Sequence, residues 1–465
     1  MSVKKALILI PDGVGLRNFV FSKIPKLLKQ KDIELTYWNA TPFDFSEADL
    51  NEIKLKGKSH PKSDLYKRAR KIIEIKQSIS RTGNLNYGSY LFKPAAKTFK
   101  QKLKNGIETF FVKKYNSTLE GLRVKIKETE AQTSYYKSCL TQLRIEQPDV
   151  LVVSNQRPIN AVAPVEAARH LGIPTVSFIF SWDNIPKATM VVETDFYMVW
   201  SELMKDQLLE YYPYIKDSQI SIVGTPQFEI HFMENFKLSR HEYFKTYDLD
   251  TDKDYICFSG DDVTTSPHDQ IYLQDVAQAV RDLNNNKTLD KPLGIIFRPC
   301  PVDFSARFDK VLSEFKEEIT VIRPAWKKYE GSWNSIMPSI EDQVLLTSTV
   351  AHTKFVVNVG SSMVFDYASQ HKPCLFINYN PKGVELKKDI HKIYKYIHFE
   401  SMPNKNAVIW LSTKEEIADK LLEGLNNPSS YVENTQKWFE IINHHSPEKA
   451  SERIVEAIEE ISKKP

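Results

Sequence analysis

The sequence predicts an α/β protein with two parallel sheets in tandem. Short, continuous apolar runs recur along both halves of the chain, and each is followed by a helical or loop segment. Such runs are typical of parallel strands that are buried on both faces. The chain has 465 residues, about three times the length of an ordinary domain, which favours two domains. Hydrophobic residues make up 42% of it, enough to form a core in each domain.

The first half opens with a strand–helix–strand pattern that is then interrupted. A turn containing Gly13 and Gly15 follows the first apolar run, and a helical stretch leads to the second run. From residue 64 to residue 147 the sequence instead indicates several basic helices. The strands expected in this half cover residues 6–10, 33–38, 149–154, 175–180, 196–200 and 220–223.

The second half repeats the alternation of strands and helices after a charged stretch. Its expected strands cover residues 255–258, 293–297, 319–322, 355–359 and 374–378. Three helical stretches follow, over residues 413–425, 429–442 and 447–462. Ser446 and Pro447 suit the cap and the first turn of the last of these.

The net charge of +4 hides a strong segregation of charge. Residues 51–127 contain 20 lysines and arginines against five acids, a local net charge of +15, and the rest of the chain carries −11. A basic block of this kind indicates a polyanionic neighbour, such as a phosphate-bearing lipid, an anionic membrane surface or a nucleic acid. The alternative is a solvated face of helices.

Within this block, apolar residues recur at near-helical spacing among lysines. This pattern is typical of an amphipathic helix at a membrane interface, and the alternative is a helix that packs its apolar face on the domain. A nucleic acid partner is disfavoured, because no RNP-type, zinc-finger or helix-turn-helix motif accompanies the charge. The apolar residues are Phe92, Phe99, Leu103, Ile107, Phe110 and Phe111, and the lysines are Lys93, Lys97, Lys100, Lys102, Lys104, Lys113 and Lys114.

Cysteine usage and the opening residues favour a reduced, cytoplasmic protein. The four cysteines are widely spaced and show neither a CxxC pair nor the spacing of a zinc site. The first apolar run has five residues, too few for a signal peptide. No stretch approaches 18 apolar residues, so we expect any membrane role to be peripheral.

The segment from residue 358 to residue 373 carries the clearest ligand signal. A strand runs into the turn Gly360-Ser361-Ser362 and then into a helix, so backbone N–H groups and two hydroxyls gather at one place. That arrangement suits a diphosphate, and Asp366 lies about one turn further on, where an acid can reach a ribose. The alternative is a helix that serine simply caps.

Residues 360–373 resemble the nucleotide-sugar motif in the second domain of GT-B glycosyltransferases. The likeness is strongest to bacterial capsule and surface-polysaccharide transferases and to the CDP-glycerol glycerophosphotransferase group. Residues 181–184, Ser-Trp-Asp-Asn, and 223–228, Val-Gly-Thr-Pro-Gln-Phe, match the same group. Residues 298–301 resemble its Arg-Pro-His-Pro element, but Cys300 replaces the histidine, so no imidazole role is carried over.

The resemblance implies a GT-B fold of two facing Rossmann-like domains. Residues 1–240 would form the acceptor domain, with a helical basic insertion at about 51–147, and residues 241–440 the donor domain. Residues 441–465 would cross back to the first domain. The donor would be a nucleotide-diphosphate sugar, without a further cofactor or a catalytic metal, since the adjacent Asp261 and Asp262 have poor ligand spacing.

On the donor side, the resemblance implies that the Gly-Ser-Ser turn holds the diphosphate and Asp366 the ribose. Arg298 would offset the diphosphate charge, or else form an ion pair. Arg323 and Trp326 would lie near the nucleobase, although Trp326 suits a core position equally well. Thr265 would touch phosphate or cap a helix.

On the acceptor side, Asp183 and Asp12 follow expected strands and are the candidates for the catalytic base of an inverting transfer. Turn geometry explains both equally well, and a retaining enzyme would need neither. Trp182 could stack on a sugar ring, and the glycine turn could let the backbone approach a ligand. The implied acceptor-binding residues are Gly13, Gly15, Trp182 and Asn184.

The expected function is a glycosyltransferase that moves a sugar from a nucleotide diphosphate to a surface glycan, which is either free or linked to a polyprenyl lipid. We expect it in the cytoplasm, at the inner face of the membrane. Three alternatives stay open: a CDP-glycerol-type glycerophosphotransferase, a nucleotide-sugar 2-epimerase, and a non-catalytic protein that binds anionic surfaces.

Overall fold

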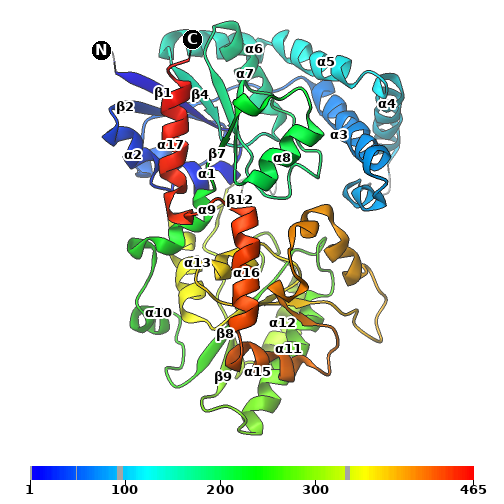
Figure 1. Cartoon of the computed structure of the whole chain (residues 1–465), viewed down its shortest axis with the longest axis vertical. Coiled ribbons are helices and arrows are strands. Elements are labelled where there is room, and N and C mark those ends of the chain that lie inside the picture. The colour runs from blue at the N-terminus through cyan, green and yellow to red at the C-terminus, as the bar shows by residue number, and fades with distance from the viewer. Residues whose placement is uncertain (1–2, 49, 92–97, 330–335, 465) are drawn as a thin grey trace. The chain divides into compact units, whose positions relative to one another are not determined.

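The computed structural model describes residues 3–48, 50–91, 98–329 and 336–464. The chain forms two compact units, Met1–Pro226 together with Ile442–Pro465, and Gln227–Ile441 (Figure 1). Each unit is built on its own parallel sheet, so the predicted α/β class with two sheets in tandem is confirmed. Phe92, Lys93 and Lys97 of the expected amphipathic helix lie outside the described residues.

The sheet of the first unit has seven parallel strands in the order β3-β2-β1-β4-β5-β6-β7. Its central strands are buried throughout because their residues are continuously apolar, as Val150–Val153 illustrates. The order reverses between β1 and β4. Strand β1 pairs with both β2 and β4, so Leu7 has Thr36 on one side and Leu151 on the other. The strands are β1 (Lys4–Ile10), β2 (Ile33–Asn39), β3 (Glu52–Lys54), β4 (Val150–Val153), β5 (Thr175–Phe178), β6 (Phe196–Val199) and β7 (Ile220–Ile222).

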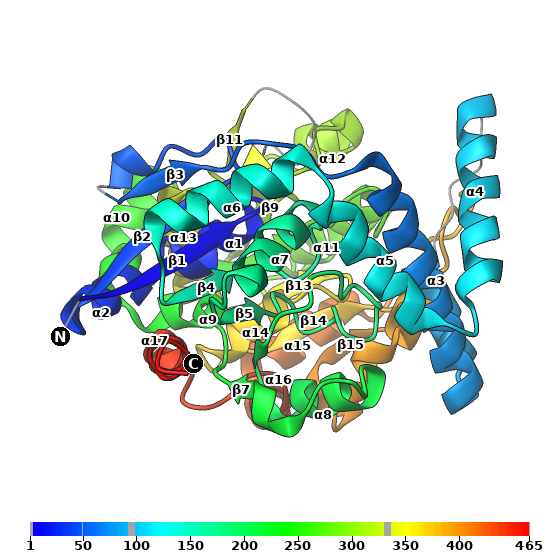
Figure 2. The same ribbon diagram turned by 90° about the horizontal axis from the view of Figure 1, so that it is seen from above.

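The basic block folds as helices that pack on this sheet and on one another. The long helix α3 begins at Pro61 and ends at Gly83, whose φ of +70° suits a glycine that terminates a helix. Helix α4 lies beside α3 at the edge of the unit, with Phe111 against Tyr66 at 4.7 Å between ring centroids (Figure 2). The helices of the block are α3 (Pro61–Thr82), α4 (Phe99–Tyr115), α5 (Leu119–Ala131) and α6 (Ser134–Glu146).

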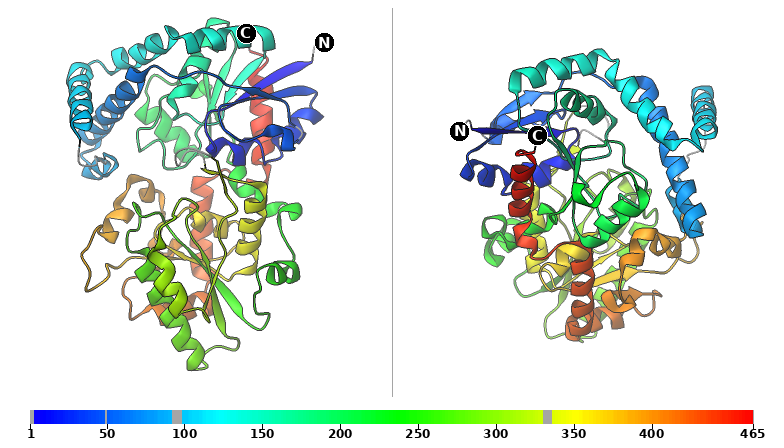
Figure 3. Two further views of the ribbon diagram at one scale, coloured as in Figure 1. Left: turned by 180° about the vertical axis from the view of Figure 1, so that it is seen from behind. Right: turned by 45° about the horizontal axis from the view of Figure 1, so that its top comes forward.

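Five further helices complete the first unit. Helix α17 (Ala450–Ile461) comes from the end of the chain and packs beside α2 (Figure 3). Lys31 forms an ion pair of 2.6 Å with Glu459, and Arg453 Nε donates to the Val223 carbonyl at 2.9 Å. The remaining helices are α1 (Val14–Phe19), α2 (Ile24–Gln30), α7 (Val162–His170) and α8 (Glu202–Tyr211), and the short α9 (Pro226–Glu229) marks the junction of the two units.

The sheet of the second unit has six parallel strands in the order β10-β9-β8-β13-β14-β15, and its order reverses between β8 and β13. A separate antiparallel pair joins β11 (Lys327–Lys328) and β12 (Ile336–Met337). The six strands are β8 (Asp254–Ser259), β9 (Leu293–Arg298), β10 (Ile319–Val321), β13 (Val356–Asn358), β14 (Cys374–Ile377) and β15 (Ile409–Leu411).

Helices surround this second sheet. They are α10 (Arg240–Thr246), α11 (Asp269–Asn285), α12 (Asp309–Glu314), α13 (Ile340–His352), α14 (Met363–Ala368), α15 (Ile417–Asn426) and α16 (Ser429–Ile442). Across the described ranges of the chain, no helix is both long and apolar enough to cross a membrane.

Candidate functional site

Each unit has one place where its fold favours a ligand. In open parallel sheets, ligands bind at the carboxyl ends of the strands, where the strand order reverses. In the first unit this place lies after β1 and β4, and we call it the first crevice. In the second unit it lies after β8 and β13, and we call it the second crevice.

Asp12 is the central carboxylate of the first crevice. It follows β1, and its Oδ2 accepts a hydrogen bond from Asn155 Nδ2 at 2.8 Å, while its Oδ1 accepts from the Val14 N–H at 3.2 Å. Burial raises the pKa of Asp12, although Asn155 and the charge of Arg157 act in the opposite direction. A carboxylate with a raised pKa at the edge of a sheet is a candidate for proton transfer.

The glycine turn beside Asp12 is explained by packing. A Cβ on Gly15 would lie 2.8 Å from Ser154 Cβ, so only glycine lets the loops after β1 and β4 meet. Gly13 has a φ of −66°, which any residue can adopt. We expected a ligand to approach the backbone closely at these glycines. At Gly15 the side chain of Ser154 occupies that space instead.

The segment after β5 directs its polar groups into the protein. Asp183 Oδ1 accepts from Ser181 Oγ at 2.8 Å and from Asn184 Nδ2 at 2.7 Å, and Asp183 also forms an ion pair with Lys187. Asn184 is buried and accepts from Gln156 Nε2 at 2.9 Å. Trp182 is 7% exposed. The structure thus places Trp182 and Asn184 inside the unit, not on an open surface where a sugar could lie.

The turn Gly360-Ser361-Ser362 lies in the second crevice, directly after β13. Gly360 has a φ of +65°, and a Cβ there would approach the Phe399 ring to 3.0 Å. Asn358 Oδ1 accepts from the Ser361 N–H at 2.9 Å, and Ser361 Oγ accepts from the Met363 N–H at 3.4 Å. Part of the expected anion-binding capacity therefore serves the turn itself.

Asp366 does not face the crevice. Its side chain is 4% exposed, and His231 Nε2 lies 2.9 Å from its Oδ1. His231 belongs to the short helical segment Ile230–Phe232 at the start of the second unit. A ribose contact through Asp366 would require this buried pair to open, so the pair instead joins α14 to the beginning of the unit.

Arg298 and Trp326 share a partner that the sequence did not reveal. Arg298 Nη2 donates to both oxygens of Asp342 at 2.9 Å, and Trp326 Nε1 donates to Asp342 Oδ2 at 2.7 Å. Arg298 and Asp342 are both buried. The charge of Arg298 is therefore balanced inside the protein by Asp342, the ion-pair alternative for this residue. Ser339 caps α13 three residues before Asp342, a signal that marks the helix start but not the pairing.

Thr265 and Arg323 lie in loops at the carboxyl edge of the second sheet. Thr265 Oγ1 donates to Asp262 Oδ2 at 2.8 Å, so its hydroxyl stabilises its own loop. Arg323 follows β10 and is exposed. Among the predicted donor residues with side-chain charge, Arg323 is thus the one whose guanidinium the fold leaves at the surface.

Two further carboxyl groups lie beyond β8, Asp261 in the loop that follows it and Asp269 at the start of α11. Asp269 Oδ2 accepts from the Asp261 N–H at 2.8 Å, and Arg307 Nη2 donates to the Asp261 carbonyl at 2.6 Å. Burial raises the pKa of Asp261 far above its ordinary value and that of Asp269 to about 7. Within the described residues no group of three or more His, Cys, Asp or Glu side chains could hold a metal ion.

A cavity of about 390 Å³ opens at the carboxyl ends of β14 and β15. Asp275 forms its charged centre, because Tyr379 Oη donates to its Oδ2 at 2.8 Å and Lys414 lies 2.6 Å from its Oδ1. His391 also lines it. None of the residues expected to bind the donor lines this cavity, so it is a neighbour of the second crevice, not part of the predicted site.

No protein-family model matches the sequence, and a comparison with curated proteins finds no match. Solved structures do match. A UDP-N-acetylglucosamine 2-epimerase from Neisseria meningitidis bound to UDP-GlcNAc is 11% identical, with a TM-score of 0.53 over 98% of this chain and 100% of its own.

Two others are similarly distant. A putative UDP-N-acetylglucosamine 2-epimerase from Listeria monocytogenes is 11% identical, with a TM-score of 0.56 over 98% of this chain and 96% of its own. A glycosyltransferase from Rickettsia africae is also 11% identical, with a TM-score of 0.52 over the full length of both chains. The chain therefore has the GT-B-like fold that its resemblance predicted.

Proposed function

We propose that the protein is a GT-B glycosyltransferase that takes its sugar from a nucleotide diphosphate. The observation that carries the proposal is the Gly360-Ser361-Ser362 turn at the reversal point of the second sheet, in a fold that a UDP-GlcNAc-bound protein shares. Ser361 and Ser362 supply hydroxyls for the donor diphosphate, and Arg323 supplies an exposed positive charge at the same edge. A glycan is the acceptor.

Asp12 is our candidate for the catalytic base, in preference to Asp183. The raised pKa of Asp12 favours proton transfer, whereas three groups already occupy the carboxylate of Asp183. Asp12→Asn can keep the hydrogen bond from the Val14 N–H but loses the one from Asn155 Nδ2, so a loss of activity at an unchanged melting temperature tests the proton-accepting role.

Helix α4 supports a peripheral membrane role. Phe99, Leu103 and Phe110 are 82%, 55% and 59% exposed, although the opposite side of the helix packs on α3 through Phe111 and Val112. Five lysines of the same helix are exposed as well, namely Lys100, Lys102, Lys104, Lys113 and Lys114. Large exposed apolar side chains among lysines favour binding to an anionic membrane.

The first experiment is a thermal-shift screen with UDP, GDP, CDP, dTDP and UDP-GlcNAc. We expect at least one of them to raise the melting temperature, because a ligand at 100 times its Kd stabilises the folded state by about 2.7 kcal/mol. Replacing both Ser361 and Ser362 with alanine should weaken the binding of that nucleotide about ten-fold, as loss of hydrogen bonds predicts.

Ser430→Ala is the matched control, because Ser430 is exposed on α16, far along the chain from the turn. It should leave the affinity unchanged. The absence of any nucleotide-dependent stabilisation would contradict the proposal and favour the non-catalytic alternative.

Product analysis separates the enzymatic alternatives. A glycosyltransferase releases a nucleoside diphosphate only when an acceptor is present, whereas a 2-epimerase interconverts nucleotide sugars without one. A CDP-glycerol-type glycerophosphotransferase would release CMP. The epimerase alternative has the support of matched structures that bear that name, among them the two reported above.

A further inference from the structure

The first crevice gathers four positive charges from three elements. Lys67 and Lys71 lie on α3 four residues apart, and therefore on one face of that helix. Arg157 follows β4, and Lys187 follows β5. All four side chains are partly buried. We call Lys67, Lys71, Arg157 and Lys187 the crevice cations.

Contacts and charge effects show that the crevice cations lie close together. Lys67 Nζ donates to the Arg157 carbonyl at 2.9 Å. Burial lowers the pKa of Lys71, and the charges of Lys187 and Arg157 lower it further. Burial also lowers the pKa of Arg157, whereas the nearby charges of Asp12 and Asp183 raise it. Arg157 and Lys67 of this cluster therefore lie near Asp12, the carboxylate that we assign as catalytic base.

The protein supplies too few anions for this cluster. Asp183 pairs with Lys187, and Asp12 is held by Asn155. Within the described part of the chain, neither the Lys71 ammonium nor the Arg157 guanidinium forms a hydrogen bond or an ion pair. The Arg157 guanidinium lies over the Phe180 ring, 4.1 Å from its centroid, which leaves its N–H groups available at the ring edge.

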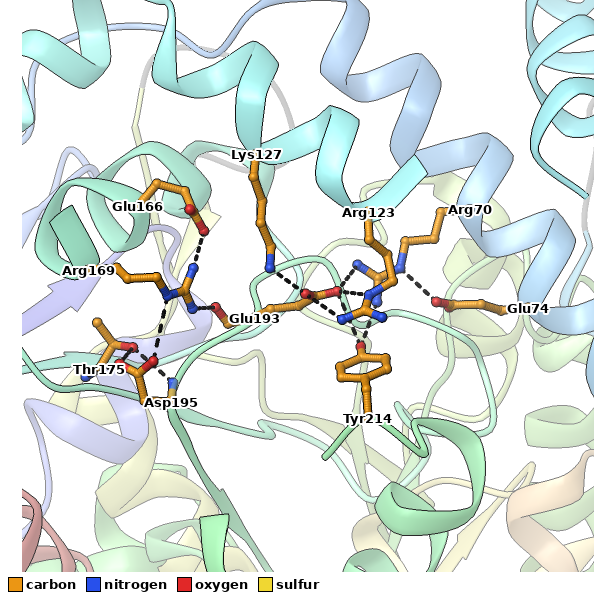
Figure 4. A network of polar contacts seen from close by, with 10 residues as sticks. All are labelled: Arg70, Glu74, Arg123, Lys127, Glu166, Arg169, Thr175, Glu193, Asp195 and Tyr214. Carbon is orange, nitrogen blue, oxygen red and sulfur yellow. Dashed lines mark hydrogen bonds and ion pairs between the residues drawn. The ribbon is translucent and has the colours of Figure 1, made fainter. Parts of the chain in front are cut away.

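The residue before Lys71 on α3, Arg70, shows how the fold treats a cation that serves structure. Arg70 pairs with Glu74 at 2.6 Å and with Glu193 at 2.9 Å, and all three side chains are buried (Figure 4). The chain thus provides carboxylates for Arg70 but none for Lys71. Partly buried cations without a carboxylate are costly to the free protein unless an anion joins them.

We propose that the crevice cations bind a phosphate or diphosphate group, and that the acceptor of the reaction carries it. The assignment to the acceptor rests on the proposed function, whereas the anion site itself does not. An acceptor held by its phosphate at Lys71 and Arg157 would lie beside Asp12. The phosphate can belong to a lipid-linked glycan or to a water-soluble one.

Inorganic pyrophosphate is the probe, titrated by calorimetry into the full chain with UDP at saturation so that the second crevice is occupied. We expect Lys71→Gln and Arg157→Gln each to weaken pyrophosphate binding about ten-fold, as expected for a charge-assisted hydrogen bond. Lys76→Gln removes the same charge from an exposed position of α3 and should leave binding unchanged.

Stability provides an independent readout. Because Lys71 is repelled by its neighbours and has no carboxylate, Lys71→Gln should unfold at the same temperature as the wild type or higher, whereas loss of a structural cation would lower it. Unchanged pyrophosphate affinity in both variants, or equal weakening by Lys76→Gln, would overturn the proposal.

The two proposals fail separately. If UDP does not bind while pyrophosphate binding still depends on Lys71 and Arg157, the donor assignment fails and the anion site stands. If UDP binds and pyrophosphate does not, only the anion site fails. A short isoprenoid diphosphate that binds more tightly than pyrophosphate would assign the site to a lipid-linked acceptor, and equal affinity would assign it to a water-soluble one. Either result supports the site.

Discussion

At the scale of single residues, the buried carboxylate of Glu193 forms ion pairs with three cations. Its carboxylate lies 2.9 Å from Arg70, 2.6 Å from Arg123 and 2.7 Å from Lys127, and its side chain is 4% exposed. Burial alone would raise the pKa of Glu193, but the three cations hold it well below its usual range. Glu193 thus fastens α3 and α5 to the loop before β6.

Glu193→Gln should destabilise the protein by about 3 kcal/mol, because it leaves Arg70 buried with too little negative charge. Since the pKa of Glu193 is lowered by folding, its contribution is present above about pH 4.5 and is lost as the pH falls. Urea denaturation at pH 7 measures the loss. Glu128→Gln, in an exposed pair with Lys125 on α5, is the control and should cost less than about 0.5 kcal/mol.

Asp269 should make the protein less stable as the pH rises, whereas the contribution of Glu193 is lost as the pH falls. Because burial raises its pKa to about 7, the folded state binds a proton that the unfolded state releases near pH 4, and stability falls as the pH rises between these values. Asp269→Asn removes this dependence and relieves Asp261, so the stability of the variant relative to the wild type should rise by about 4 kcal/mol between pH 4 and pH 8.

The measurement is the free energy of unfolding of wild type and Asp269→Asn at several pH values from 4 to 8. Asparagine can still accept the Asp261 N–H bond through its carbonyl oxygen, so the loop should keep its shape. Parallel pH profiles for the two proteins would show that Asp269 is ionised in the folded state.

At the scale of elements, the cations of the basic block, residues 51–127, face three different surroundings. Arg70, Arg123 and Lys127 turn inward to Glu193, Lys67 and Lys71 turn to the first crevice, and the lysines of α4 are exposed. The packing interpretation of the amphipathic pattern therefore holds for one side of α4, and the membrane interpretation stays a prediction for the other side. One side of α4 packs on α3, and the other presents Phe99, Leu103 and Phe110.

Replacing Phe99, Leu103 and Phe110 together with serine should reduce binding to vesicles that contain anionic phospholipid by at least ten-fold, because burial of one large apolar side chain contributes about 1.5–3 kcal/mol. Co-sedimentation measures the bound fraction, and nucleotide affinity should not change. The control replaces exposed Val263, Val302 and Phe304 of the second unit with serine. Wild-type protein that does not bind such vesicles would exclude the membrane role.

At the scale of the whole molecule, the first unit is completed by the end of the chain. The second unit is continuous, whereas α17 returns to the first and buries Ile454, Val455, Ile458 and Ile461 there. Apolar residues recur every three or four positions along α17, so they share one face of the helix for this contact.

Ile458→Ala should lower the free energy of unfolding of the first unit by about 3 kcal/mol, since Ile458 is completely buried. Glu456→Ala changes an exposed residue of the same helix and should change stability by less than about 0.5 kcal/mol. Limited proteolysis, with cleavage sites identified by mass spectrometry, measures which unit opens. Equal resistance of both variants would show that α17 does not hold the first unit together.

The sequence by itself determined the two-sheet α/β class and eleven of the thirteen strands that the described residues form in the two parallel sheets. It did not reveal β3, which has one apolar residue between two charged ones, or the three-residue β15, because short edge strands carry little pattern. The sequence also located the loops after β1, β5, β9 and β13, since a strand end can be read locally.

Only the tertiary structure decided what the side chains in those loops contact. Asp366 pairs with His231, 135 residues away, and Arg298 with Asp342, 44 residues away. Lys67 and Lys71 reach the first crevice from a helix whose sequence shows only that it is basic. A buried charge needs a partner, and packing of distant segments decides which partner is near. Local pattern therefore predicts where a polar residue lies along the fold, but not whether it serves the ligand or the protein.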